Sequence, residues 1–308
     1  MRVSNKSKAL YFFIVASTAL YGISGVVAYK AVQLLPLGNM IFLYAIGNFL
    51  GFFLLYKPLK MRLRVGLSAY GLAATAGIIM STLLYLLFFA YTHYNLAQIF
   101  PFMSLSALLF FFIDVVVYRR NIPLRLGLVI MSGMFLMVLG AFFTGSTGFS
   151  FNILLLPLIV AFIVLGGIGN YLYFYKIKTY SIGSKELSFI SVFFVLGLFL
   201  TISHGFGNAI SPGGIAYSII AGFTGIVATI FELHAIKGYE QGKISKLVAQ
   251  RNFINSFTYL DTVLVLIGSI IIGSFTYLEV LGGLGMVVGI IIISWARPKG
   301  HMQSKQSI

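Results

Sequence analysis

The stretch Phe231–Asp261, FELHAIKGYEQGKISKLVAQRNFINSFTYLD, contains two apolar segments on either side of a short basic turn. Four ionisable side chains, Glu232, His234, Arg251 and Asp261, lie within these segments or at their edges. The other long apolar segments of the chain carry almost no charge. A charge deep in hydrocarbon costs about 2.5–3.5 kcal/mol, so charges retained here indicate a structural or functional role inside a membrane.

The composition is that of an integral membrane protein. Of the 308 residues, 59% are hydrophobic and 9% are charged, and the mean hydropathy is +1.01. A soluble domain of this length needs more charge to cover its surface. The net charge of +15 comes from short scattered clusters without a nucleic-acid-binding motif, so we expect no nucleic acid partner. The absence of cysteine excludes disulfides, thiolate metal sites and a cysteine nucleophile.

Charged residues divide the chain into five apolar blocks, each about twice the ~20 residues that one spanning helix needs. The blocks therefore predict ten transmembrane helices in an all-α membrane protein, and none of them alternates as a barrel strand does. The first apolar run is long enough to span and has no small-residue cleavage site, so we expect it to remain as a helix. The predicted ranges are 9–29, 38–56, 68–91, 97–118, 124–143, 152–175, 186–203, 213–236, 247–271 and 276–295.

The positions of lysine and arginine predict the orientation. Twenty of the 21 basic residues, including Lys185 before the seventh helix, fall on one side of the predicted membrane. Basic residues favour the cytoplasmic side, so we expect both termini in the cytoplasm and a multi-pass protein of the cell membrane. Lys30 alone falls on the outer side, where it either anchors the first helix at the headgroups or forms part of an outer gate.

Weak internal similarity predicts a duplication. Residues of the first half match residues of the second half at offsets of about 145 to 149. The matches are Gly133 and Gly140 with Gly282 and Gly289, Tyr29-Lys30 with Tyr175-Lys176, Ala90 with Ala235, and Asp114 with Asp261. They predict two five-helix repeats, residues 1–146 and 147–308. Because five is odd, the second repeat enters the membrane inverted, as in many secondary transporters.

Several short motifs resemble those of one transporter family. Leu20-Tyr21-Gly22-Ile23-Ser24 followed by Lys30, Ala90-Tyr91-Thr92, Glu232–Lys237 and the paired glycines are similar to motifs of the EamA-like branch of the drug/metabolite transporter superfamily. The resemblance implies a small-metabolite permease, often an exporter of amino acids or related compounds. It also implies a cavity walled by the first, third, fourth, sixth, eighth and ninth helices.

Five charged residues are candidates for coupling or gating. Asp261 lies about 21 Å into the 247–271 helix, and deep carboxylates tend to mark ion or proton paths, so protons are a candidate coupling ion. Asp114 lies near the cytoplasmic end of its helix, where local pairing and a functional role remain open. Glu232 and Arg251 have similar shallow depths, which favours a structural ion pair over a cytoplasmic gate. Lys30 is the outer candidate.

Uncharged polar groups near mid-depth are the candidate substrate ligands, because bundle sites are mostly apolar with a few convergent polar groups. They are Tyr21, Ser24, Thr82, Tyr85, Asn170, Thr229, Asn255 and Tyr259. The histidines lack metal-ligand spacing, so we expect no metal, no cofactor and no enzymatic activity. The leading hypothesis is a secondary transporter of small metabolites, monomeric or homodimeric, working by alternating access in the lipid bilayer. The alternative is a lipid- or amphiphile-handling membrane protein or a membrane-embedded enzyme.

Overall fold

The computed structural model describes residues 5–63, 67–103, 105–106, 109, 124–144, 146–147, 150–151, 153–170, 172, 182–204, 211–240 and 260–295. Within these residues the regular elements are helices apart from one pair of two-residue strands. The helices of the first half are α1 (Asn5–Leu34), α2 (Leu37–Tyr56), α3 (Leu67–Tyr91), α4 (Leu96–Met103) and α6 (Leu124–Thr144). Strands β1 (Ser146–Thr147) and β2 (Ser150–Phe151) and the 3₁₀ turn η1 (Ile153–Leu155) follow. The remaining helices are α7 (Leu156–Asn170), α8 (Ile182–His204), α9 (Pro212–Glu240), α11 (Leu260–Ile271) and α12 (Tyr277–Trp295).

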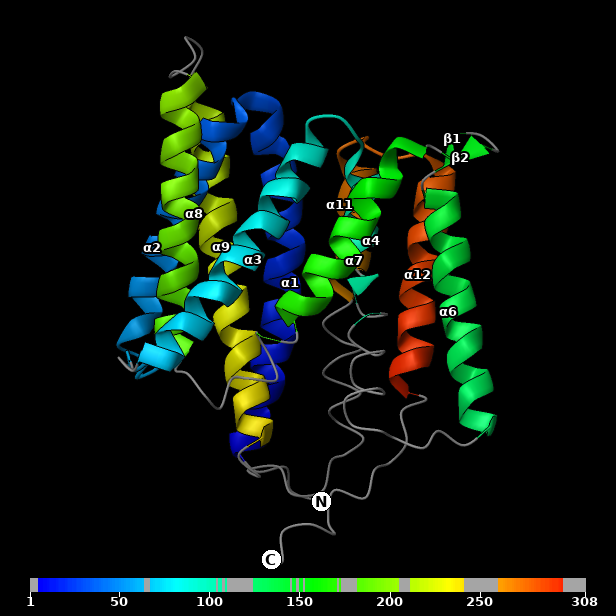
Figure 1. Cartoon of the computed structure of the whole chain (residues 1–308), viewed down its shortest axis with the longest axis horizontal. Coiled ribbons are helices and arrows are strands. Elements are labelled where there is room, and N and C mark those ends of the chain that lie inside the picture. The colour runs from blue at the N-terminus through cyan, green and yellow to red at the C-terminus, as the bar shows by residue number, and fades with distance from the viewer. Residues whose placement is uncertain are drawn as a thin grey trace, which may run out of the picture.

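The helices lie alongside one another in one bundle (Figure 1). α1 packs against α9, and α2 packs against both α8 and α9. α6 and α12 pair with each other at the other end of the view, and α11 contacts α1, α4 and α12. Six helices in the described part are long and apolar enough to cross a membrane, namely α1, α2, α3, α6, α8 and α9, while the apolar helices α7, α11 and α12 are shorter.

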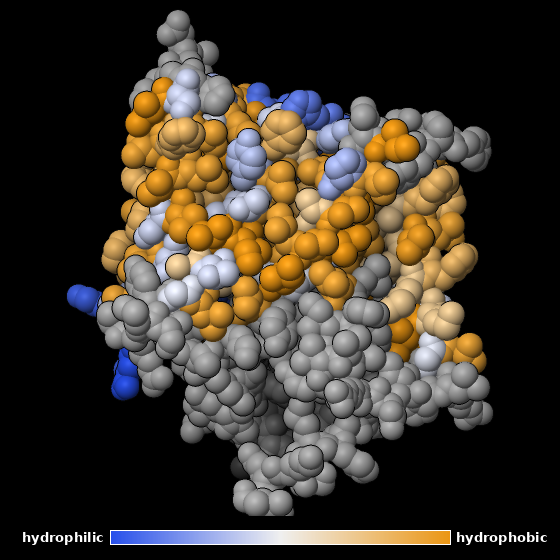
Figure 2. Space-filling model, in the orientation of Figure 1, coloured by the Kyte–Doolittle hydropathy of each residue, from blue (hydrophilic) through white to orange (hydrophobic). Residues whose placement is uncertain are grey.

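Large apolar side chains cover the outside of the bundle. Phe53 of α2, Phe135 of α6 and Phe199 of α8 are 62%, 66% and 65% exposed. Figure 2 shows apolar side chains over most of the described surface in view, with the strongly hydrophilic ones toward its edges. Apolar surface on this scale is unfavourable in water and favourable in lipid. The described helices therefore form an all-α, membrane-type bundle.

The observed helices overlap the predicted ranges, but several helix ends differ from the prediction by four or five residues, and the differences at the end of α1 and the start of α8 bear on Lys30 and Lys185. α1 continues to Leu34 instead of ending at residue 29, because the first residue that disfavours a helix is Pro36. Lys30 therefore lies within α1 rather than in a connection. α8 begins at Ile182 instead of residue 186, which places Lys185 in its first turn. All of 247–259 and most of 104–118 lie outside the described residues.

Glycines allow close approach between α2 and α9. A Cβ at Gly47 of α2 would collide with the carbonyl oxygen of Ile219, and one at Gly222 of α9 would collide with the carbonyl oxygen of Tyr44. Small residues at helix interfaces let the backbones approach closely. In a lipid bilayer the hydrophobic effect does not drive helices together, so such close packing contributes to their association. The two backbones are in direct contact at this point.

Glycines also allow close approach between α6 and α12. A Cβ at Gly140 would lie 2.5 Å from the carbonyl oxygen of Gly282, and one at Gly289 would lie 2.5 Å from that of Gly133. The four glycines that match between the two halves of the sequence therefore contact each other in pairs, Gly140 with Gly282 and Gly133 with Gly289.

The start of α12 is held by a capping box. The backbone amide of Thr276 donates to the carboxylate of Glu279 at 2.6 Å, and the Glu279 amide donates back to the Thr276 hydroxyl at 3.3 Å. Asn95, just before α4, donates to the same carboxylate at 3.4 Å, and the Leu96 amide donates to the Ser274 hydroxyl. These bonds tie the starts of α4 and α12 together.

Candidate functional site

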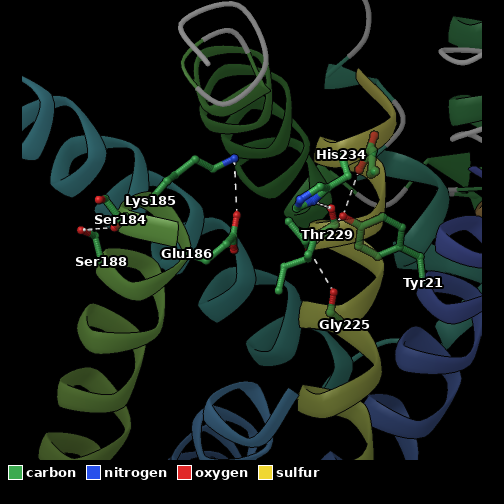
Figure 3. A network of polar contacts seen from close by, with 10 residues as sticks. Tyr21, Ser184, Lys185, Glu186, Ser188, Gly225, Thr229 and His234 are labelled. Atoms are coloured by element: carbon green, nitrogen blue, oxygen red, sulfur yellow. Dashed lines mark hydrogen bonds and ion pairs between the residues drawn. The ribbon is translucent and has the colours of Figure 1, made fainter. Parts of the chain in front are cut away.

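A group of buried and half-buried polar and charged side chains lies on α1, α8 and α9 inside the apolar bundle (Figure 3). We call it the buried polar cluster, and it consists of Tyr21 of α1, Lys185 and Glu186 of α8, and Thr229 and Glu232 of α9. The two sides of the cluster come from the two halves of the chain. Because Tyr21 and α9 are far apart in the sequence, no local sequence pattern predicts that they meet.

Tyr21 bridges α1 to α9. Its hydroxyl oxygen lies 2.9 Å from the Thr229 hydroxyl and 3.0 Å from a carboxylate oxygen of Glu232. Residues 229 and 232 are three apart, so both side chains lie on the same face of α9. Thr229 donates its own proton to the carbonyl oxygen of Gly225 at 3.0 Å. A phenol has one proton, and donation to the charged carboxylate is the stronger bond, so Glu232 is its principal acceptor.

Lys185 and Glu186 form an ion pair in the first turn of α8. The ammonium nitrogen lies 3.5 Å from a carboxylate oxygen of Glu186, and both side chains are 0% exposed. The two side chains extend from α8 toward α9 and α1 in Figure 3. Figure 3 shows this pair in the same view as the hydrogen bonds between α1 and α9.

Burial of the charged groups of this cluster lowers the stability of the folded protein unless other interactions compensate. Burial of an ion pair costs desolvation free energy that the mutual attraction repays only with good geometry and further hydrogen bonds. Replacing such a pair by apolar residues is often neutral or stabilising. Ionisable residues within spanning segments therefore tend to mark substrate, ion or proton paths. Lys185 and Glu186 are the residues that sequence analysis missed, since Lys185 was counted with the cytoplasmic connection.

Asp261 lies in the first turn of α11, and it is half-buried. The Thr262 hydroxyl donates to its carboxylate at 3.3 Å. Asp261 is ten residues before Ile271, which is about 15 Å along the helix axis and about half of a ~30 Å hydrocarbon core. Asp261 therefore lies about half the thickness of a hydrocarbon core away from the last residue of α11.

The other described candidates have different environments. Ser24 is buried and donates to the carbonyl oxygen of Ala221 at 2.8 Å, so it ties α1 to α9. Thr82 is exposed on α3 and donates to the carbonyl oxygen of Ile78 of its own helix. Tyr85 is half-buried, with its ring stacked 6.4 Å from that of Phe89. Ser24 thus lies near the cluster's helices, whereas Thr82 faces away from the interior.

Several predicted site residues fall where the structure gives no side-chain description. Asn170 ends α7, and nothing is described of its side chain. Asp114, Arg251, Asn255 and Tyr259 lie outside the described residues. The pairing of Glu232 with Arg251 accordingly stays a prediction. Half-buried Lys30 occupies the last turns of α1.

His234 lies two residues after Glu232 on α9 and contacts its own helix. Its Nδ1 is 2.9 Å from the carbonyl oxygen of Ile230, and its ring is 6.3 Å from that of Phe13. Among the residues that the structure describes, no group of three or more His, Asp or Glu side chains is arranged to hold a metal ion.

The buried polar cluster gathers polar and charged groups of several kinds on three helices. It offers a charge-paired ammonium, two carboxylates, a phenol and a hydroxyl within an apolar bundle. No known family model matches the chain, and no curated protein matches it.

Proposed function

We propose that the protein is a multi-pass secondary transporter of small metabolites that works by alternating access. The observation that carries the proposal is the buried polar cluster, because it retains charges inside a bundle whose outside is apolar. Replacing such a buried pair by apolar residues is often neutral or stabilising, so stability alone does not account for it. Solute and ion paths are the usual reason for such residues.

Reciprocal glycine contacts support an inverted repeat. In the proposed repeat, Gly133 corresponds to Gly282 and Gly140 corresponds to Gly289. A two-fold relation requires that if one residue touches the counterpart of a second, the second touches the counterpart of the first. The contacts of Gly140 with Gly282 and of Gly133 with Gly289 have this reciprocity.

Two glycines nearer the centre of the bundle show a related pattern at the level of whole helices. A Cβ at Gly22 of α1 would lie 2.7 Å from the Leu264 side chain of α11, and one at Gly167 of α7 would lie 2.7 Å from the Leu109 side chain. In the proposed repeat α7 is the counterpart of α1, and the predicted 97–118 helix, which includes Leu109, is the counterpart of α11. These contacts support the architecture in which a site lies between two inverted halves. They also support the proposed membership of the EamA-like branch of the drug/metabolite transporters.

The proposed orientation places both termini in the cytoplasm. The first residue of α1 and the last residue of α12 lie at the same end of the bundle (Figure 1). Lysine and arginine concentrate in the predicted connections on that side, which is the expected bias for cytoplasmic segments of a cell-membrane protein. The cluster then lies in the cytoplasmic half, near the start of α8 and the end of α9.

The proposed mechanism uses the contact between the halves. The Tyr21 bond to Glu232 joins the first half of the chain to the second, so rocking of one half against the other lengthens or breaks it. Asp261, a half-buried carboxylate in the first turn of α11, is the proposed proton carrier if transport is coupled to protons. The protein performs no covalent chemistry in this proposal, and it needs no cofactor.

Transport in proteoliposomes tests the proposal. Vesicles with purified protein are loaded with an isotope-labelled extract of small metabolites, and efflux is followed by mass spectrometry with and without a pH gradient. We expect selective efflux of a subset of metabolites, and slower gradient-driven efflux with Asp261→Asn. Efflux equal to that of protein-free vesicles refutes transport. Normal gradient-driven efflux with Asp261→Asn refutes the proton role alone.

A further inference from the structure

The turn that follows α2 carries three cationic side chains. Lys57, Lys60 and Arg62 are all exposed, and residues 57–62 contain no acidic residue. Among the residues that the structure describes, none of the three side chains has an ion-pair partner. The end of α2 lies at the same end of the bundle as the start of α1, which is the cytoplasmic end in the proposed orientation (Figure 1). The turn is therefore a small, uncompensated positive patch at the proposed cytoplasmic surface of the membrane.

Backbone hydrogen bonds fix the shape of this turn. The Met61 amide donates to the carbonyl oxygen of Tyr56 at 3.1 Å, and the Lys60 amide donates to that of Lys57 at 3.0 Å. This pattern is a Schellman cap, whose left-handed position is usually occupied by glycine. Lys60 occupies that position with a φ of 48°, and it is the one non-glycine residue with positive φ in the described part of the chain. A residue with a Cβ is disfavoured in this conformation, so the backbone outlier points to a role for the lysine side chain.

The turn is also anchored on α8. Met61 is 6% exposed, and a Cβ at Gly183 would lie 3.4 Å from the Met61 Cβ and 3.0 Å from the carbonyl oxygen of Arg62. Gly183 is the second residue of α8. Because the buried Met61 lies between Lys60 and Arg62, the backbone that carries both cations is held in a defined place. A connection that served only as a topology signal would need basic residues but no such fixed placement.

An apolar face of α2 leads directly to these cations. Leu50, Phe53 and Leu54 are 54%, 62% and 61% exposed, and Lys57 follows them at helical spacing. The four side chains therefore lie on one face of the helix. Leu50 and Lys57 are about 10 Å apart along the helix axis, at about 1.5 Å per residue. An apolar strip that ends in cations matches a phospholipid, whose acyl chain contacts the apolar side chains while its phosphate reaches the cations.

We propose that the turn after α2 is a binding site for an anionic phospholipid of the cytoplasmic leaflet, whose phosphate is held by Lys57, Lys60 and Arg62. One acyl chain of this lipid lies along the exposed face of α2. The three uncompensated cations favour a lipid with net negative charge over a zwitterionic one, and the cytoplasmic leaflet is the leaflet with a negative surface potential. Each basic side chain contributes about fivefold to the affinity for such a surface. The inference depends on membrane insertion and not on transport.

Binding of defined lipids to the purified full-length protein in detergent tests the inference. The probes are dioleoylphosphatidylglycerol, dioleoylphosphatidylcholine, which has the same acyl chains and no net charge, and glycerol 3-phosphate, which has the phosphate without acyl chains. Native mass spectrometry measures the affinity for the first bound molecule, and the unfolding temperature shows whether each variant is folded. A site variant and a control variant each replace three basic residues by glutamine, in the turn after α2 and near the C-terminus of the sequence. The substitutions are Lys57→Gln, Lys60→Gln and Arg62→Gln in the site variant, and Arg297→Gln, Lys299→Gln and Lys305→Gln in the control.

We expect wild type and the control variant to bind dioleoylphosphatidylglycerol with equal affinity, and more tightly than dioleoylphosphatidylcholine. The site variant should bind the anionic lipid about a hundredfold more weakly, at about fivefold for each lost cation, and its binding of the zwitterionic lipid should not change. Lys60→Gly should weaken anionic-lipid binding about fivefold. It should also raise the unfolding temperature without lipid, because glycine adopts the left-handed conformation readily.

Equal binding of the anionic lipid by wild type and the site variant overturns the inference, as does an equal loss in the control variant or equal affinity of wild type for the two lipids. Unchanged lipid binding in Lys60→Gly also overturns it. Glycerol 3-phosphate that binds as tightly as the anionic lipid refutes the lipid and identifies a soluble phosphate ester as the ligand. None of these measurements involves efflux, so a failure here is distinct from a failure of the proposed function.

Discussion

The contact between α6 and α12 allows a quantitative test of the packing. Gly140→Ala adds a Cβ 2.5 Å from the carbonyl oxygen of Gly282 and 2.8 Å from the amide nitrogen of Met286. Ordinary van der Waals contact begins at 3.4 Å, so the new atom is about 0.9 Å too close to a backbone oxygen. Backbone atoms cannot rotate away, so the helices must separate. Overpacking of this kind costs about 1–3 kcal/mol.

Gly127→Ala is the matched control, because Gly127 lies on the same helix with nothing within 4 Å of its added Cβ. Both substitutions gain the same helix propensity, about 0.5–1 kcal/mol, so this term cancels in the comparison. We expect the free energy of unfolding of Gly140→Ala to lie about 1–3 kcal/mol below that of Gly127→Ala. Gly289→Ala, at the reciprocal position, should show the same loss.

The assay is unfolding by sodium dodecyl sulfate in mixed micelles, followed by tryptophan fluorescence. The chain has one tryptophan, Trp295, which is the last residue of α12 and so reports on the helix under test. Equal unfolding midpoints for Gly140→Ala and Gly127→Ala would refute the close α6–α12 contact. A loss at Gly140 without one at Gly289 would refute the reciprocity on which the inverted repeat rests.

The polar contacts make three further predictions in the same unfolding assay. Tyr21→Phe should lower the free energy of unfolding by about 1–3 kcal/mol because a buried carboxylate loses its donor, whereas Thr82→Val should leave it unchanged; equal values for the two would contradict this reading. Glu186→Met should cost about 3–5 kcal/mol, and adding Lys185→Met should recover most of the loss, since an apolar pair replaces a broken ion pair; a double variant as unstable as the single one is the contrary result. Glu279→Ala should cost about 1 kcal/mol through loss of the α12 cap, and an unchanged midpoint would show that the cap does not stabilise the helix.

Helix positions follow from the sequence because hydrocarbon thickness sets the length of each apolar run. The predicted range 124–143 corresponds to α6 at Leu124–Thr144, and 38–56 corresponds to α2 at Leu37–Tyr56. The prediction fails where charge alone was used to end a helix. Lys30 continues α1, since a lysine is a good helix former and the backbone geometry changes only at Pro36.

The site could be predicted in part. Tyr21 and Thr229 are recognisable as polar groups near mid-depth and Glu232 as a carboxylate in an apolar segment, although nothing local shows that residues more than 200 positions apart meet. Lys185 and Glu186 could not be recognised, because a lysine and a glutamate before an apolar run look the same in a connection and in a buried pair. Only tertiary packing, which excludes water from the first turn of α8, distinguishes the two cases.

Alternating access makes a prediction that does not depend on the substrate. The chain has no native cysteine, so Thr229→Cys introduces one thiol into the buried polar cluster. The rate of its reaction with a membrane-impermeant charged thiol reagent is measured in vesicles of both orientations. Lys57→Cys and Thr92→Cys, both exposed, are controls for the predicted cytoplasmic and outer sides.

The account predicts that Thr229→Cys reacts from both sides of the membrane, while Lys57→Cys reacts only from the cytoplasmic side and Thr92→Cys only from the outside. Reaction of Thr229→Cys from one side alone, or from neither, would contradict alternating access through the cluster.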